Sequence, residues 1–177
     1  NALYQRVSAD GDANSALDSA TLQPLVGPRS DNNLVDQPFS KQIQYYSAAV
    51  DYRAPWADFV SASSYTNTKT SQTTDESYIF GVAFPFFGFP AGTSQSQYRL
   101  HLEKYTQEFR LQSLPGQRLE WLGGVFATYE RSSNFQQPNA MTAGGVPITA
   151  IDPIFSAQLP STYAEYAAFG DLTFHVT

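Results

Sequence analysis

Several oxygen-bearing side chains near the start of the chain have a spacing that could bind a cation. They are Asp10, Asp12, Asn14 and Asp18, at the first, third, fifth and ninth positions of a calcium-loop pattern. Such a loop also requires a glycine at its sixth position and a bidentate glutamate at its twelfth. Because Ser15 and Thr21 stand there instead, we expect a solvated loop and assign no metal ligand.

The two histidines have few neighbours that could complete a metal or nucleophile site. His101 is close in sequence to Glu103, and His175 shares a predicted strand face with Asp171. A zinc site needs three or four converging ligands, and the chain has no cysteine to supply a thiolate. We therefore interpret both histidines as wall residues of the fold.

The sequence shows no constellation typical of an enzyme. It has no G-x-S-x-G nucleophile elbow, and its glycines do not lie between a strand and a helix as a nucleotide site requires. The one carboxylate pair that we considered for hydrolysis is Glu108 and Glu120, from neighbouring predicted strands. We expect no enzymatic activity and assign no catalytic or cofactor-binding residue.

Composition favours an all-β domain. Of the 177 residues, 15% are aromatic and only 15% are charged, whereas about 25% are charged in a typical soluble domain. Aromatic residues are enriched in strands. From the formal net charge of -6 we expect no nucleic-acid partner, because binding phosphates needs a basic face.

The stretch around which the chain is organised is a predicted hairpin between Tyr105 and Tyr129. In its first strand Tyr105, Gln107, Phe109 and Leu111 alternate with polar residues, which is the period of two expected for a strand with unlike faces. Pro115 and Gly116 supply a tight turn. In the second strand Leu119, Trp121, Val125, Ala127 and Tyr129 share one face.

The same alternation predicts three more strands and an uneven set of connections. The additional strands are IQYYSAAVDYR (43–53), DFVSASSYTNT (58–68) and TYAEYAAFGDLTFHVT (162–177). We expect one partial domain over 1–177, with a polar loop region at 1–41 and strands over 42–177 that are interrupted by long loops at 69–97 and 132–161. Short turns alternate with long loops, which is typical of an outer-membrane barrel.

The first long loop becomes strongly aromatic and is the candidate ligand-contact region. Its aromatic side chains are Tyr78, Phe80, Phe84, Phe86, Phe87 and Phe89. The other interpretation is that this loop packs on itself, as large ordered loops usually do. The loop 136–161 is a second candidate for ligand contact.

Two further features fit strands that cross a membrane. Trp121 and Tyr129 lie eight positions apart on one face, which corresponds to about 19 Å of height at a strand tilt near 45°. The opposite faces of the strands carry residues that would line the lumen of a barrel. These are Glu108, Arg110, Glu120, Glu130, Glu165 and Asp171.

The segments YTQEFRLQS and LEWLGGVFATYERS, joined by their turn, resemble a barrel hairpin of TonB-dependent outer-membrane receptors. VDYRAPWADFVSASSYTNT is similar to the preceding hairpin of that family, and TYAEYAAFGDLTFHVT to the next strand. The resemblance implies a barrel of about 22 strands with an N-terminal plug domain, in the outer membrane of a Gram-negative bacterium. It also implies energised uptake of a scarce extracellular ligand, with the TonB complex and outer-membrane lipid as partners. Such ligands are ferric siderophores, haem, cobalamin or oligosaccharides.

We expect an antiparallel up-and-down meander of about five long strands, cut from a larger barrel. The final residues TFHVT continue a strand pattern without a terminating signal. Five strands cannot close a barrel or transport a ligand, and their open edges predict a homo-oligomer or a domain swap. The alternative is a soluble all-β binding module, with carbohydrate as a ligand that its aromatic loops could stack on.

Overall fold

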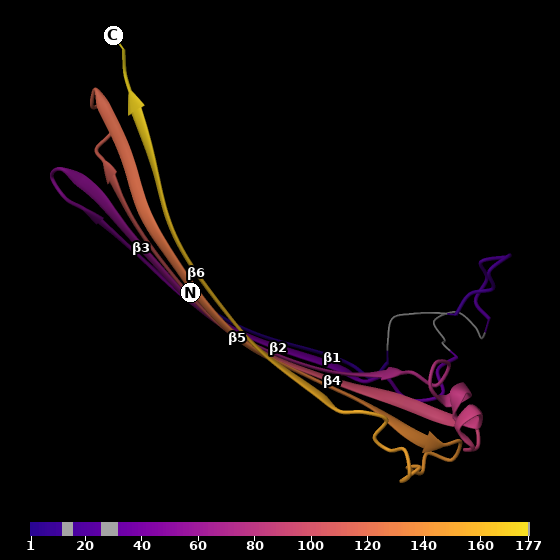
Figure 1. Ribbon diagram of the computed structural model, residues 1–177. Coiled ribbons are helices and arrows are strands. Elements are labelled where there is room, and N and C mark those ends of the chain that lie inside the picture. Colours follow the sequence, from indigo (N-terminus) through magenta and orange to yellow (C-terminus); the bar gives the residue numbers. More distant parts are fainter. Residues whose placement is uncertain (12–15, 26–31, 177) are drawn as a thin grey trace.

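The computed structural model describes residues 1–11, 16–25 and 32–176, and it shows one antiparallel sheet (Figure 1). The strands follow one another in the sheet in chain order, which confirms the all-β, up-and-down meander. The elements are β1 (Ala2–Ala9), β2 (Phe39–Arg53), β3 (Ala57–Asp75), the 3-10 helix η1 (Gly81–Phe87), β4 (Gly92–Ser113), β5 (Leu119–Thr142) and β6 (Ala157–Phe174). Within the described ranges, no helix has the length and apolar character needed to cross a membrane.

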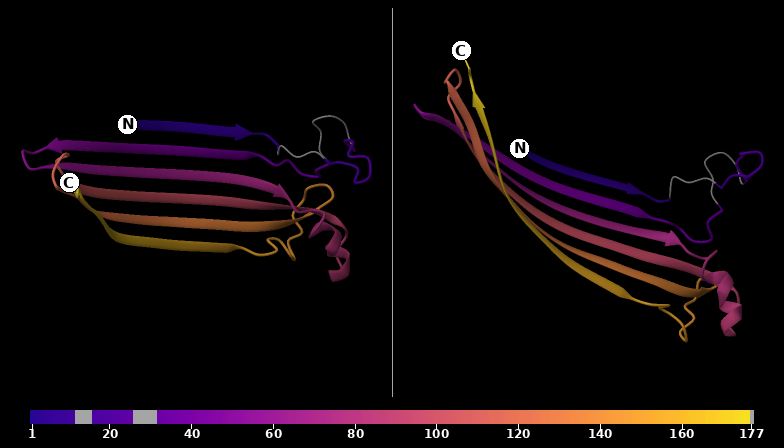
Figure 2. Two further views of the ribbon diagram at one scale, coloured as in Figure 1. Left: turned by 90° about the horizontal axis from the view of Figure 1, so that it is seen from above. Right: turned by 45° about the horizontal axis from the view of Figure 1, so that its top comes forward.

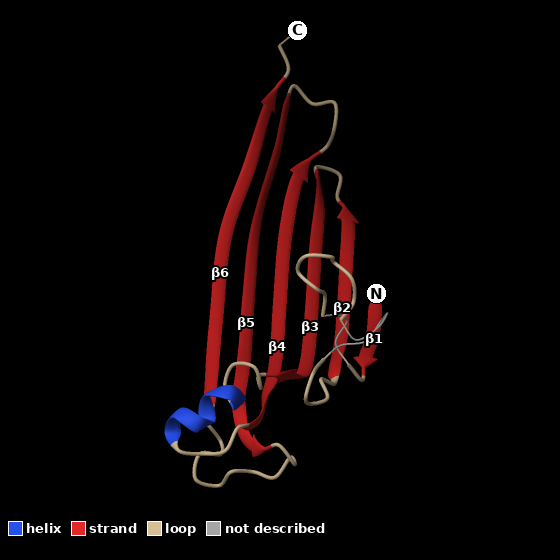
Figure 3. Cartoon of the chain, turned by 90° about the vertical axis from the view of Figure 1, so that its right-hand side faces the viewer, coloured by secondary structure: helices blue, strands red, loops and turns tan. Residues whose placement is uncertain are grey.

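The sheet has two unlike ends, which we call the turn end and the loop end (Figure 3). The turn end carries the short connections 54–56 and 114–118. In the second of these, Gly116 has φ +80°, and its N–H donates to the Glu120 side chain over 2.7 Å. The loop end carries η1 and the long connections. The predicted hairpin is confirmed, with Tyr105 directly opposite Tyr129.

The strands extend further toward the loop end than the sequence predicts. β3 and β4 reach into the expected 69–97 loop and leave a connection of 76–91, while β5 and β6 reduce the expected 132–161 loop to 143–156. The expected polar loop region 1–41 contains β1 and the start of β2, so the sheet has six strands rather than about five. These extensions are rich in Ser, Thr, Gln and Asn on both faces, so they show no hydrophobic alternation. Pairing with a neighbouring strand fixes them instead.

The sheet is a single curved layer without a second layer packed against it (Figures 1 and 2). Its accessible surface is 11962 Å², whereas a compact folded protein of this mass exposes about 8,500 Å². Among the described residues, the buried apolar side chains are Ala57, Phe84, Pro138 and Ala140. The two packed sheets and dry core of a sandwich are therefore not found in the described part of the chain.

Both edges of the sheet are open among the described residues. β1 pairs only with β2, and β6 pairs only with β5. Almost the whole of β6 is exposed, including Tyr166 and Leu172. Open edges present unpaired backbone groups that can receive another strand.

Candidate functional site

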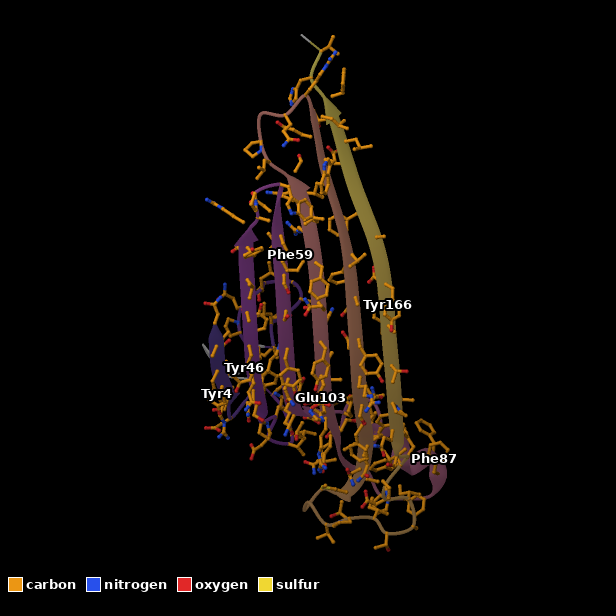
Figure 4. The ribbon with its side chains drawn as sticks, turned by 90° about the vertical axis from the view of Figure 1, so that its left-hand side faces the viewer. Tyr4, Tyr46, Phe59, Phe87, Glu103 and Tyr166 are labelled. Carbon is orange, nitrogen blue, oxygen red and sulfur yellow. The ribbon has the colours of Figure 1, made fainter. Side chains whose placement is uncertain are left out.

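The strand register brings four tyrosines into a line across the sheet, which we call the tyrosine row. Tyr46, Tyr65, Tyr105 and Tyr129 are successive cross-strand partners in β2, β3, β4 and β5. The Tyr46 and Tyr65 rings stack with centroids 6.4 Å apart, and the Tyr65 and Tyr105 centroids are 4.6 Å apart. Figure 4 labels Tyr46 on this side of the sheet, which we call the tyrosine face. Tyrosine and tryptophan are enriched where an apolar phase meets water.

Two hydroxyls of the tyrosine row have partners that lie nearer the loop end. The Tyr65 hydroxyl donates to Glu103 Oε1 over 3.1 Å and accepts a hydrogen bond from Asn67 Nδ2 over 3.2 Å. The Tyr129 hydroxyl accepts a hydrogen bond from Arg131 Nε over 2.6 Å. Tyr65 and Tyr129 therefore direct their hydroxyl groups toward the loop end.

Between the tyrosine row and the turn end, the tyrosine face carries no charged residue in β2 to β6, and we call this area the uncharged band. Its central members are Ala48, Val50, Phe59, Phe109, Val125, Ala127, Tyr166, Ala168 and Leu172. The Gln107 amide lies among them and is satisfied locally, because Nε2 donates to Ser61 Oγ over 3.1 Å and Oε1 accepts from Ser63. Val125 and Tyr166 are 52% and 81% exposed, so the band is an uncovered apolar surface.

Trp121 lies on the tyrosine face near the turn end, eight residues from Tyr129, as the alternation predicts. Its cross-strand partner in β6 is Leu172. Nearby, the Arg118 guanidinium lies 5.1 Å from the centre of the Phe174 ring. Polar and aromatic groups thus meet again at the turn end of the band, about 19 Å in height from Tyr129 if the strands tilt by about 45°.

The opposite face, which we call the charged face, carries the residues that the sequence assigns to a lumen. Their common register places them on one side of the sheet: Glu108, Arg110, Glu120, Glu130, Glu165 and Asp171. Most of them bond to near neighbours. Arg110 pairs with Glu108, Lys104 lies 3.7 Å from Glu130, and the Tyr163 hydroxyl donates to Glu165 over 2.8 Å.

The candidate carboxylate pair is not brought together. Glu108 is opposite Phe126, which is six residues along β5 from Glu120 and corresponds to about 20 Å. Carboxyl groups of glycosidases are about 5–9.5 Å apart. Glu120 instead lies 3.4 Å from His175 beside the turn. Among the described residues, no three His, Asp or Glu side chains converge to hold a metal ion, and Asp12, Asn14 and Ser15 of the calcium-like spacing lie outside the described ranges.

A second candidate region is an apolar groove of about 420 Å³ at the loop end, where the two long connections meet. It is lined by Phe80, Ala83, Phe84, Phe87, Ala150, Ile151, Pro153 and Ile154. Of the predicted contact residues, Phe80, Phe84 and Phe87 line this groove, whereas Tyr78, Phe86 and Phe89 do not. Phe84 is buried, but Phe87 is 74% exposed, so the aromatic loop packs partly on itself and partly faces outward (Figure 4).

Close backbone contacts hold the first wall of the groove. An added Cβ at Gly81 would lie 2.3 Å from the Gly92 carbonyl oxygen, and one at Gly92 would lie 2.0 Å from the Met141 carbonyl oxygen. Only glycine permits approaches of this kind. They bring η1 against the ends of β4 and β5 and bury Phe84.

The second wall of the groove is bonded to β5. Asp152 Oδ1 accepts hydrogen bonds from the Ala140 N–H over 2.9 Å and from Asn139 Nδ2 over 3.0 Å. The Ile154 N–H donates to the Pro138 carbonyl over 2.9 Å. The sequence predicts the loop 136–161 as a ligand-contact region but does not single out residues 150–154. Isolated Ala, Ile and Pro residues in a loop form no pattern that would mark them.

The segment before β2 is also fixed at the loop end. Asp75 accepts hydrogen bonds from the Leu34 N–H and, over 2.8 Å, from the Ser77 N–H. The side-chain oxygen Oε1 of the buried Gln37 accepts a hydrogen bond from the Asp75 N–H over 3.0 Å. Burial opposes the ionised form, but the hydrogen bonds from Ser77 and Leu34 prevail and hold the pKa of Asp75 below its ordinary value.

Comparisons with known proteins identify no relative of this chain. No family model matches the chain, and the searches of curated proteins and of solved structures find no significant match.

Proposed function

We propose that this chain is a sector of a transmembrane β-barrel, with the tyrosine face toward lipid and the charged face toward the lumen. The observation that carries the proposal is the uncharged band bordered by the tyrosine row. In a bilayer, every backbone polar group must be paired within the protein, and strands meet this need only in a closed sheet. The open edges of β1 and β6 are then the places where further strands of the barrel continue the ladder.

The orientation of the sector follows from its two ends. Outer-membrane barrels have short turns on the periplasmic side and longer loops outside. The turn end would therefore face the periplasm, and the loop end with η1 would face the exterior. The charged residues Glu108, Arg110 and Glu165 would be hydrated in the lumen, where charge is tolerated.

Together with the resemblance of its hairpins, this arrangement supports a TonB-dependent outer-membrane receptor as the parent protein. Such a receptor takes up a scarce ligand, and the sector cannot do so alone. The groove between η1 and residues 150–154 would contact the ligand from outside. Its lining has no ionisable side chain, so it suits an apolar or ring-shaped face of the ligand rather than a charged group.

The test of this assignment is the complete reading frame around the segment. We expect many more alternating strands beyond it and a separate globular domain before the first strand of the barrel. A frame that supplies no further strands on either side would contradict the proposal, because six strands cannot close around a plug. The soluble binding module, with the groove as its ligand site, would then be the better explanation.

A further inference from the structure

Beyond the tyrosine row, the tyrosine face carries a group of cations, which we call the basic patch and define as Arg6, Lys69 and Arg99. Arg6 and Lys69 belong to one register line, Arg6–Gln42–Lys69–His101–Ser133, which crosses β1 to β5. Arg99 is two residues from His101 along β4, toward the loop end. All three cations line a hollow of about 500 Å³ together with His101.

The basic patch lacks carboxylate partners among the described residues. The ion pairs of the sheet involve Lys104, Arg110 and His175, and none involves the patch. Arg99 donates to Gln97 Oε1 over 3.0 Å and lies 5.4 Å from the centre of the Phe135 ring. The carboxylate on the tyrosine side of the hollow is Glu103, which accepts hydrogen bonds from Tyr65 and Asn67. Uncompensated cations are unexpected in a chain with a net charge of -6.

The position of the patch points to its ligand. Lys69 and His101 are each four residues beyond a tyrosine of the row, about 13 Å along a strand and about 9 Å in height at a tilt near 45°. If the tyrosine row marks the edge of the hydrocarbon layer, this height lies at the level of lipid headgroups, which extend several ångströms beyond that edge. The patch also opens on the same face as the uncharged band.

We propose that the basic patch binds the phosphate groups of an anionic membrane lipid. Arg6, Lys69 and Arg99 supply the positive charge, and the hydroxyl and amide groups of Ser71 and Gln42 in the same hollow can donate hydrogen bonds to phosphate oxygens. The inference rests on the proposed placement of the tyrosine face toward lipid. It assigns this hollow to a lipid rather than to the transported ligand.

Lipid selectivity can be measured in vesicles on the complete barrel to which this sector belongs. Ser133, on the same register line, is replaced by cysteine; the sector has no other cysteine, and any cysteine elsewhere in the barrel is replaced by serine, so a fluorophore attaches there alone. Quenching by nitroxide-labelled phosphatidylglycerol is compared with quenching by the same amount of nitroxide-labelled phosphatidylcholine. Each basic residue near a membrane surface favours anionic lipid by about fivefold, so we expect the anionic lipid to associate at least tenfold more strongly.

Two matched double variants separate the patch from net charge. Lys69→Gln/Arg99→Gln should reduce the selectivity about thirtyfold, or to none. Lys104→Gln/Arg110→Gln removes one lysine and one arginine from the charged face and should leave it unchanged. Equal quenching by the two lipids in the parent chain, or equal losses in the two double variants, would overturn the inference.

Two further outcomes identify where a failure lies. Inorganic phosphate, added in excess over the anionic lipid, should not displace that lipid. Displacement would assign the patch to a free anion and overturn the lipid assignment. Absence of quenching by both lipids would contradict the membrane placement of the tyrosine face itself, whereas quenching by both without selectivity would contradict the basic patch alone.

Discussion

The two faces of the sheet share one backbone and differ only in their side chains. From the tyrosine row to the turn end, the tyrosine face of β2 to β6 has no charge. The opposite face over the same strands carries Asp51, Asp58, Glu108, Arg110, Glu120, Glu165 and Asp171. Because no second layer covers either face in the described chain, the difference indicates two different surroundings rather than a core and a surface.

The largest effect should come from adding charge to one face or the other. Ala168 and Ala167 are exposed neighbours in β6 that point to the tyrosine face and the charged face, respectively. In the complete barrel in vesicles, Ala168→Arg should reduce the free energy of unfolding by about 2–4 kcal/mol, because arginine would enter the hydrocarbon layer. Ala167→Arg should change stability by about 0.5 kcal/mol or less. Urea unfolding of the complete barrel in vesicles measures both.

The same pair of variants can also contradict the difference between the two faces. If Ala167→Arg costs as much as Ala168→Arg, the two faces have equivalent surroundings. If the chain is instead a soluble module, the two variants should also have the same free energy of unfolding in the absence of vesicles.

A smaller contrast is expected at two adjacent glycines. An added Cβ at Gly124, on the charged face, would lie 2.3 Å from Phe169 Cζ and 2.9 Å from the Phe109 carbonyl oxygen. Gly123, on the tyrosine face, has open space around the same position. Gly124→Ala should cost about 1–3 kcal/mol of unfolding free energy, whereas Gly123→Ala should be neutral or stabilising by about 0.5 kcal/mol. Equal unfolding midpoints for the two variants would show that Phe169 does not pack over Gly124.

Acid should act on the loop end and leave the uncharged band unaffected. Burial opposes ionisation of Asp75, but hydrogen bonds from Ser77 and Leu34 hold its pKa below the ordinary 3.8. Since the folded-state pKa is the lower one, its stabilisation is complete above about pH 5 and is lost as pH falls through the folded-state pKa.

Amide exchange of Leu34, corrected for the intrinsic pH dependence, measures this effect. Protection should be constant from pH 7 to pH 5 and should fall in stronger acid, while the amide of Val125 in the centre of β5 stays protected. Asp75→Asn retains only part of the acceptor and should weaken protection at every pH without a titration. A parent chain whose Leu34 protection is independent of pH would refute the role of Asp75.

Alternation was sufficient to predict the sheet where one face is apolar. The Tyr105–Tyr129 hairpin and the faces of Phe109 and Trp121 follow from a period of two, because a register shift by one residue would exchange the faces. β1 and the loop-end halves of β3 to β5 could not be found in this way. The extensions 69–75, 92–97 and 132–142 are largely polar on both faces, and β1 mixes apolar and polar residues on each face, with Leu3 beside Gln5 and Tyr4 beside Arg6. Only pairing with the neighbouring strand, which sequence does not display, makes them strands.

The candidate sites were predictable to different degrees. Phe80, Phe84 and Phe87 belong to an aromatic run that the sequence makes obvious, but which of its rings line the groove depends on the contact of Gly81 with Gly92. The tyrosine row depends on register across β2 to β5, which aligns residues far apart in the chain. The basic patch was invisible in the sequence, since Arg6, Lys69 and Arg99 come from separate strands of an acidic chain.

The central claim, that the tyrosine face lies against lipid, is tested most directly by the depth of two adjacent residues. Val125 and Phe126 lie in the middle of β5 on the tyrosine face and the charged face. In two separate variants of the complete barrel, Val125 or Phe126 is replaced by a cysteine that is then the single cysteine of the protein. The cysteine is labelled with an environment-sensitive fluorophore, and the barrel is placed in vesicles that contain a nitroxide in the middle of the acyl chain. We predict blue-shifted, strongly quenched emission at position 125 and water-like, weakly quenched emission at position 126. Equal quenching at the two positions, or none at 125, would contradict the claim.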